Sequence, residues 1–347
     1  MLQATAEPGR PDGAGGDQAV AEPIPHWPGH VVELPLGQVH VRSAPAQPGA
    51  EPAVFVHGLG GSATNWTDLM DLLSRPQRPR QGAPAADWPG TAVLACSAID
   101  LPGFGSSPPP LSGDYSVTAH AAVVAALIEA QGQGPVHLVG NSLGGAVSTR
   151  VAARWPDLVR TITLISPALP DLRPRPLPIR LALASLPGIG PAIMEWLRSV
   201  PAESRTDRTF RDLFPDPGVI HPSRRSAEVA EVLRRDTLLY ASSALVLSAR
   251  SLVGEYLKVG RNTLWRDAAA SSAPALILHG SHDRLVNPVM AGKAARAFRD
   301  ARVLVLPGVG HVAMMERPAL VAAEIRAFLG RVSACADEGG GAKLARC

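Results

Sequence analysis

Cysteine is scarce in this chain of 347 residues, and long apolar runs are missing. The three cysteines, Cys96, Cys335 and Cys347, are too few for a disulfide framework, and no metal-ligand spacing links them. No apolar stretch approaches the length of a membrane span, and the N-terminus lacks the charged start and apolar segment of a secretory signal. We therefore expect a cytoplasmic protein with no bound metal and no integral membrane contact.

Excess charge of one sign is also lacking. The net charge is only +3, so a nucleic-acid or acidic-membrane partner is not indicated. Apolar residues make up 46% of the chain, which is ample for one large core or for a core with a smaller accessory unit. Residues 1–28 and 331–347 show no periodicity and are rich in small and polar residues, so both are predicted to be disordered tails.

Short apolar runs alternate with helical patterns between these tails. The runs typical of strands are Val31–Leu34, Val39–Arg42, Ala53–Val56, Ala92–Ile99, Pro135–Val139, Val159–Ile165, Ala275–Leu278 and Val303–Leu306. This alternation predicts an α/β fold with a mostly parallel, doubly wound sheet. It stops over residues 167–273, where Pro-rich turns, an Arg-rich middle and a helical apolar segment predict a helical cap inserted between core segments 29–166 and 274–330.

The strongest chemical signal is the sequence GNSLGG at residues 140–145. It follows an apolar strand and opens a helical pattern, so Ser142 is predicted to lie on a sharp strand-to-helix turn with its hydroxyl exposed at the sheet edge. The next backbone N–H, that of Leu143, then lies at a helix N-terminus, where it can stabilise a developing oxyanion.

Four further motifs accompany this turn. They read HGLGG at 57–61, DLPGFGS at 100–106, GSHDRLVNP at 280–288 and GHVAMMERP at 310–318. As a set, the five motifs resemble the α/β-hydrolase superfamily, in its serine-nucleophile branch with a helical cap after the sixth strand. The resemblance covers residues 31–166 and 274–330, whereas the cap shows no comparable match.

This resemblance implies roles for individual residues. Ser142 would be the nucleophile, His311 the general base and Asp283 the acid that orients the histidine, in the chain order that this fold uses. Each follows a predicted strand, so parallel strands would bring all three to one sheet edge. Asp171, after the sixth strand, is the alternative acid. The backbone N–H groups of Leu59 and Leu143 would form the oxyanion hole. The residues expected to contact the substrate are Gly58, Gly60, Asn141, Val312 and Met314.

The function expected from this site is hydrolysis of a carboxylic ester with a small-to-medium apolar acyl group, as in esterases and lipases, without a cofactor. Three alternatives stay open: hydrolysis of a carbon–carbon bond in ring-fission diketones, cofactor-free haloperoxidase or perhydrolase activity, and ligand binding without catalysis on the same fold. Asn141 beside the nucleophile favours the diketone hydrolases, but Leu59 and Val312 depart from their pattern. Epoxide hydrolases and dehalogenases are disfavoured because their nucleophile is an aspartate.

Overall fold

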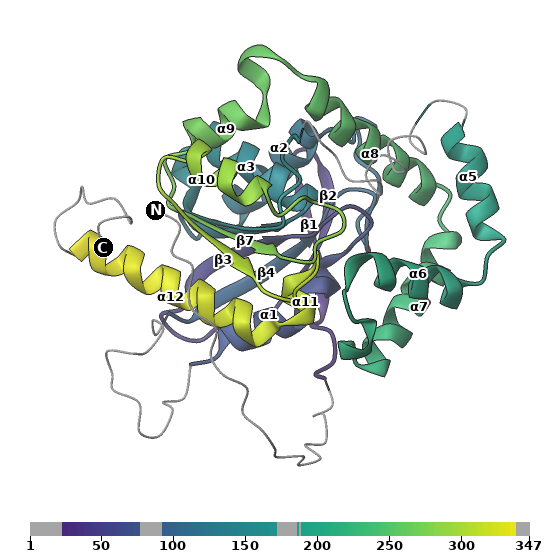
Figure 1. Ribbon diagram of the computed structural model, residues 1–347, viewed down its shortest axis with the longest axis horizontal. Helices are drawn as coiled ribbons and strands as arrows, with labels where there is room; N and C mark the ends of the chain where they lie inside the picture. Colours follow the sequence, from purple (N-terminus) through teal and green to yellow (C-terminus); the bar gives the residue numbers. More distant parts are fainter. Residues whose placement is uncertain (1–22, 77–91, 172–185, 187–188, 338–347) are drawn as a thin grey trace.

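One sheet organises the chain in the computed structural model, which describes residues 23–76, 92–171, 186 and 189–337 (Figure 1). The eight strands of the described residues follow the order β1-β2-β4-β3-β5-β6-β7-β8. The pairs β1–β2 and β2–β4 are antiparallel, and all later pairs are parallel. The strands are β1 (Gly29–Leu34), β2 (Gly37–Ser43), β3 (Glu51–Val56), β4 (Leu94–Asp100), β5 (Val136–Asn141), β6 (Val159–Ile165), β7 (Ala275–Gly280) and β8 (Ala301–Leu306). The predicted α/β fold with a mostly parallel sheet is confirmed.

Helices cover both faces of the sheet. One apolar cluster contains side chains from α2 (Val117–Gln131), α3 (Leu143–Arg154), α9 (Leu264–Ala270) and α10 (Met290–Ala297). A second cluster, on the other face, contains side chains from α1 (Thr67–Ser74), α11 (Ala313–Glu316) and α12 (Pro318–Asp337). The central strands are buried on both sides, as the wholly buried β5 illustrates. This double burial explains why their sequences are continuous apolar runs.

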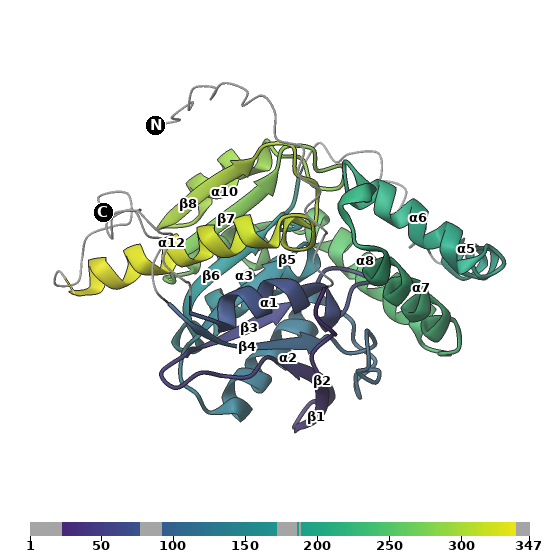
Figure 2. The same ribbon diagram turned by 90° about the horizontal axis from the view of Figure 1, so that it is seen from below.

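The helical segment between β6 and β7, which the sequence predicts to be a cap and which is called the cap below, projects from one side of the core (Figure 2). Within the described residues it contains α5 (Ile189–Arg198), α6 (Ala202–Leu213), η4 (Pro217–Val219), α7 (Pro222–Asp236), α8 (Ala241–Leu257) and η5 (Gly260–Asn262). The predicted cap, residues 167–273, also includes the residues of α9. In the structure α9 packs against α3 within the helical layer of the core, because its buried Leu264 and Ala268 join the first cluster. The residues of α9, at the end of the predicted cap, therefore pack with the core helices.

Both predicted tails need correction where the structure describes them. Residues 23–28 are ordered, since Trp27 packs against the second cluster and its Nε1 donates to the Thr67 carbonyl at 3.2 Å. Helix α12 continues past the predicted boundary at 330 to Asp337, because Val332 packs against the same cluster. Residues 1–22 and 338–347 of the two predicted tails lie outside the described residues, as do 172–185 and 187–188 of the predicted cap.

No single helix in the described part of the chain is long and apolar enough to cross a bilayer. Helices α7 and α8 meet the length and composition requirement only as a pair, and they are bent by 100° relative to one another.

Candidate active site

Ser142 occupies the turn between β5 and α3. Its backbone has φ of 53° and ψ of −115°, a conformation that costs a residue other than glycine about 1–3 kcal/mol. The flanking glycines are required by space: a Cβ at Gly140 would lie 2.4 Å from the Gly144 carbonyl oxygen, and one at Gly144 would lie 2.1 Å from the Val56 carbonyl oxygen. The predicted sharp turn is therefore present. The Ser142 residue keeps 9% of its surface exposed.

His311 and Asp283 form a buried pair at the same edge of the sheet. The distance from His311 Nδ1 to Asp283 Oδ2 is 2.8 Å, and the residues are 2% and 0% exposed. The other carboxylate oxygen accepts the backbone N–H groups of Leu285 and Val286 at 2.8 and 2.9 Å. Burial alone would raise the pKa of the Asp283 carboxyl, but the charge and hydrogen bond of His311, with the Val286 N–H, hold it below its usual value. The carboxylate is thus fixed in its ionised form.

The turn that carries Ser142 is joined directly to the loop that carries His311. The side-chain amide of Asn141 donates to the His311 carbonyl at 3.2 Å and to the Ile165 carbonyl at 3.0 Å. The Ser142 hydroxyl and the His311 imidazole, both described, make no hydrogen bond to each other in this conformation. Such bonds are often long before substrate binds.

Asp171, the alternative acid, is placed elsewhere. Burial raises the pKa of Tyr256 in α8 to about 12, and the nearby Asp171 charge contributes to that increase. The imidazole of His311 is paired with Asp283. Of the two candidate acids, Asp283 is therefore the one that contacts His311.

The loop after β3 is held beside the nucleophile. A Cβ at Gly58 would lie 3.2 Å from Ser142 Cβ, so glycine allows this close approach. The Gly58 carbonyl accepts two hydrogen bonds, from His57 Nδ1 at 2.7 Å and from the Gly61 N–H at 3.1 Å. Because His57 Nε2 accepts the Leu101 N–H at 3.0 Å, the imidazole proton resides on Nδ1. His57 thus orients the loop, and both of its ring nitrogens are occupied.

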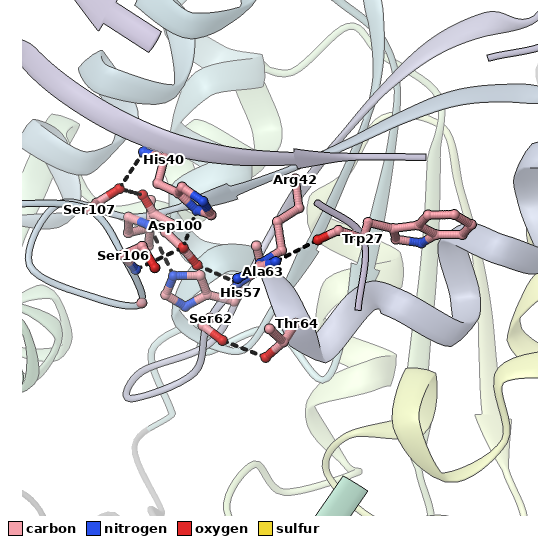
Figure 3. A network of polar contacts seen from close by, with 12 residues as sticks. Trp27, His40, Arg42, His57, Ser62, Ala63, Thr64, Asp100, Ser106 and Ser107 are labelled. Carbon is pink, nitrogen blue, oxygen red and sulfur yellow. Dashed lines mark hydrogen bonds and ion pairs between the residues drawn. The ribbon is translucent and has the colours of Figure 1, made fainter. Parts of the chain in front are cut away.

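Asp100, at the end of β4, links this loop to its neighbours (Figure 3). Its carboxylate accepts from His40 Nδ1 at 2.8 Å, from the Ala63 N–H at 2.6 Å and from the Ser106 N–H at 2.9 Å. Ala63 begins the short helix η1 (Ala63–Trp66), which follows the loop after β3. Burial would raise the pKa of the Asp100 carboxyl, but the hydrogen bonds from His40, Ala63 and Ser106 hold it below its usual value. Asp100 therefore fixes two loops, the one after β3 and the one after β4.

The structure places the expected substrate-contacting residues in different surroundings. Gly58 and Gly60 lie in the loop beside Ser142, and Gly60 has φ of 74°. Asn141 is 2% exposed, and its amide joins two strand ends. Val312 and Met314 are 6% and 1% exposed and pack in the second apolar cluster. Substrate contact by these residues stays a prediction.

Two hydrogen bonds between the cap and the loops of the candidate site could not be predicted from the sequence. The Leu213 carbonyl at the end of α6 accepts the His311 N–H at 2.9 Å, and Arg235 Nη1 in α7 donates to the Gly60 carbonyl at 2.7 Å. The Arg-rich stretch is most simply interpreted from sequence as a solvated face. The structure shows instead that some of its arginines reach the core.

A cavity of about 760 Å³ lies between α7 and α1, with walls that include Phe210, Ile220 and Met315. Ser142 is not among its lining residues, so the cavity is not assigned to the substrate. Among the described residues, no group of three or more His, Cys, Asp or Glu side chains is arranged to hold a metal ion.

Comparison with known proteins agrees with this arrangement. A family model described as the alpha/beta hydrolase fold matches residues 52–318. The chain is 28% identical over 285 residues to the dihydrolipoyllysine-residue acetyltransferase component of the acetoin cleaving system of Cupriavidus necator, covering 80% of this chain and 63% of that protein. The chain thus spans less than two thirds of that relative.

Other relatives match over more of their own length. Lipase 3 of a Moraxella species is 25% identical, with 80% of this chain and 77% of the lipase covered. The 2-(acetamidomethylene)succinate hydrolase of Mesorhizobium japonicum is 26% identical, with 80% and 87% covered.

Solved structures support the fold alone, because their sequence identities are low. The haloalkane dehalogenase DbeA of Bradyrhizobium elkani superposes with a TM-score of 0.71 at 22% identity, covering 89% of this chain and 99% of that one. The 2-hydroxy-6-oxo-6-phenylhexa-2,4-dienoate hydrolase of a Rhodococcus species gives a TM-score of 0.65 at 19% identity, covering 87% and 99%. The sheet, the turn at Ser142 and the family match lead to one conclusion: this chain belongs to the alpha/beta hydrolase fold family.

Proposed function

We propose that this protein hydrolyses carboxylic esters, with Ser142 as nucleophile, His311 as general base and Asp283 as the acid that orients the imidazole. The observation that carries the proposal is the 2.8 Å pairing of His311 with Asp283 at the sheet edge where Ser142 occupies its strained turn. The similarity to a lipase and to another hydrolase supports the reaction class.

The reaction has two halves. In the first, His311 Nε2 takes the proton from Ser142 Oγ as Oγ attacks the carbonyl carbon, and the carbonyl oxygen becomes an oxyanion. His311 then gives this proton to the alkoxide, which departs as an alcohol and leaves an acyl-enzyme. In the second half, His311 takes a proton from water, the hydroxide attacks the acyl carbon, and Ser142 Oγ regains the proton as the acid is released.

The oxyanion is held by two backbone N–H groups in this proposal. Leu143 is the first residue of α3, so its N–H has no partner within the helix. The Leu59 N–H donates to no other group in the part of the chain that the structure describes. Removing one such donor typically costs about 10²–10³ in turnover. No step calls for a metal ion or an organic cofactor.

The substrate we propose is an ester with an apolar acyl group of small to medium size. The diketone alternative rested on Asn141 beside the nucleophile. In the structure both donor positions of that amide are used, on the Ile165 and His311 carbonyls. Asn141 therefore gives the carbon–carbon hydrolase alternative no support.

The first test is labelling by a fluorophosphonate probe, together with turnover of p-nitrophenyl esters of increasing acyl length. Ser142→Ala is expected to abolish labelling and to lower kcat by about 10⁴–10⁶. Ser148→Ala, which removes a buried hydroxyl from helix α3, is the control and should keep both probe labelling and ester turnover. A folded wild-type protein that neither labels nor turns over any ester would refute the proposal and favour a binding role. Rapid turnover of a ring-fission diketone without ester hydrolysis would establish the alternative reaction.

The second test separates the two candidate acids. Asp283→Asn should lower kcat by about 10⁴, because the imidazole loses the partner that fixes its tautomer. Asp171→Asn should leave kcat within about twofold, since that carboxylate lies beside Tyr256. The reverse pattern would exchange their roles.

A further inference from the structure

Helix α7 of the cap is attached to the core mainly by arginines. Only Val232 of this helix is buried, so apolar packing contributes little. Arg224 pairs with Asp68 of α1, and Arg234 donates to the Gly105 carbonyl. Arg235 Nη1 donates to the Gly60 carbonyl at 2.7 Å, within the loop that supplies the proposed Leu59 donor.

The contact made by Arg235 begins a chain of hydrogen bonds through two peptide groups. The Gly60 carbonyl belongs to the same peptide group as the Gly61 N–H. That N–H donates to the Gly58 carbonyl at 3.1 Å. The Gly58 carbonyl belongs in turn to the same peptide group as the Leu59 N–H. The hydrogen bonds therefore run from the Arg235 guanidinium to peptide 60–61, and from there to peptide 58–59, whose N–H is the proposed donor to the oxyanion.

Such a series changes the strength of its last donor. When a carbonyl oxygen accepts a hydrogen bond, the N–H of the same peptide becomes a stronger donor, and successive bonds strengthen one another in this way. A charged donor at the start has a larger effect than a neutral one. His57, the other donor to the Gly58 carbonyl, is kept neutral because burial lowers its pKa. Arg235 is thus the source of positive charge for this series.

The geometry of the loop agrees with this role. Gly60 has φ of 74°, which lets its carbonyl turn toward the cap, and a Cβ there would lie 3.4 Å from Leu245 of α8 and 3.9 Å from Arg235 Nη1. The Arg235 side chain is 27% exposed, and its Nη2 lies 3.4 Å from Glu228 Oε1, so the closer partner of Arg235 is the carbonyl.

We propose that Arg235 is a positioning residue for ester hydrolysis: it fixes and polarises the Leu59 N–H through the two intervening peptide groups, so that oxyanion binding depends on docking of α7. This inference rests on the proposed function. It also implies that lifting α7 would weaken oxyanion stabilisation, because it would remove the charged donor.

The test compares substitutions of Arg235 in the full-length protein. Arg235→Met should lower kcat about tenfold, a fraction of the value of a whole oxyanion donor, while KM stays within about twofold. Arg235→Gln keeps a hydrogen-bond donor without the charge and should be intermediate. Arg235→Lys restores a charged donor and should return kcat to within about threefold of wild type.

Two control variants separate this role from attachment of the cap. Arg234→Met removes the neighbouring contact to Gly105, and Arg225→Met removes an ion pair with Asp207 inside the cap. Both should leave kcat within about twofold. If Arg234→Met lowers kcat as much as Arg235→Met, loss of either arginine contact has the same effect, and a specific role for the Arg235 contact with Gly60 is refuted.

A second readout follows oxyanion binding directly. The inhibition constant of a trifluoromethyl ketone, which adds to the serine as an oxyanion, should rise across the Lys, Gln and Met variants in proportion to the loss of kcat/KM. Millimolar methylguanidinium should partly restore Arg235→Ala. Unchanged kcat and ketone affinity in Arg235→Met, with wild-type turnover dependent on Ser142, would refute the inference alone. Absence of any Ser142-dependent turnover would refute the proposed function instead.

Discussion

Arg150 of α3 lies at the centre of a buried ionic cluster that joins the core to the cap. The residue is 1% exposed. Its guanidinium donates to both carboxylate oxygens of Glu255 in α8, at 2.8 and 3.0 Å, and to Asp267 in α9 at 2.9 Å. Thr118 Oγ1 accepts a further bond at 2.9 Å. Arg150→Met keeps much of the side-chain volume and removes all four hydrogen bonds at once.

The magnitude of this change follows from what remains. Glu255 is also 1% exposed, and after the substitution only Lys258, at 2.6 Å, would offset its charge, while Asp267 would lose its Arg150 partner. Breaking a buried ion pair by removing one partner costs about 3–5 kcal/mol, because the other charge stays desolvated. We expect Arg150→Met to lower the free energy of unfolding by this amount. Adding Glu255→Gln should recover part of the loss, because it neutralises the stranded charge.

The assay is equilibrium unfolding in urea at neutral pH, followed by tryptophan fluorescence. Arg160→Met is the matched control, since the bridge from Arg160 to Glu51 joins side chains that are 47% and 35% exposed and should contribute at most about 1 kcal/mol. An Arg150→Met protein within about 1 kcal/mol of wild type would refute the reasoning. So would a double variant whose loss equals the sum of the single losses, because the two groups would then be uncoupled.

Two further predictions concern buried polar groups. Burial lowers the pKa values of His120 and His279 to about 4, so at pH 5 the unfolded chain binds protons that the folded one does not. The free energy of unfolding should therefore fall as pH drops from about 6.5 toward 4, by up to about 1.4 kcal/mol per pH unit for each histidine. Urea titrations at several pH values check this, and a flat profile would contradict it. Asn141→Ala should cost about 1–3 kcal/mol, because the His311 carbonyl loses its amide donor and the Ile165 carbonyl keeps only the Ser142 N–H. Asn141→Asp should cost more, because a carboxylate would face both carbonyl oxygens. An Asp variant as stable as the Ala variant, measured by urea unfolding, would count against this account.

The sheet and the strand-to-helix turn could be predicted because local rules decide them. Continuous apolar runs predict strands buried on both faces, and Val159–Ile165 matches β6 at both ends. The turn at Ser142 needs glycine at positions 140 and 144, so these two glycines predict the turn from the sequence alone.

Contacts between distant segments could not be predicted in the same way. An arginine on a polar helix face has the same pattern whether it meets water or a carbonyl, so Arg235 gave no sign of its contact with Gly60. The end of α12 was missed for a related reason. One glycine at position 330 costs the helix about 1 kcal/mol, and packing of Val332 offsets it.

The six residues that precede β1 contact both the cap, through α7, and the core, through α1. The Ile24 carbonyl accepts a hydrogen bond from Arg224 of α7 at 2.8 Å, and His26 Nδ1 lies 2.7 Å from the Thr67 hydroxyl of α1. Removing the residues before 29 for expression or crystallisation would keep every described strand. It would remove the contacts that this segment makes with α7 and α1. A shortened protein should therefore be tested for attachment of the cap to the core as well as for folding.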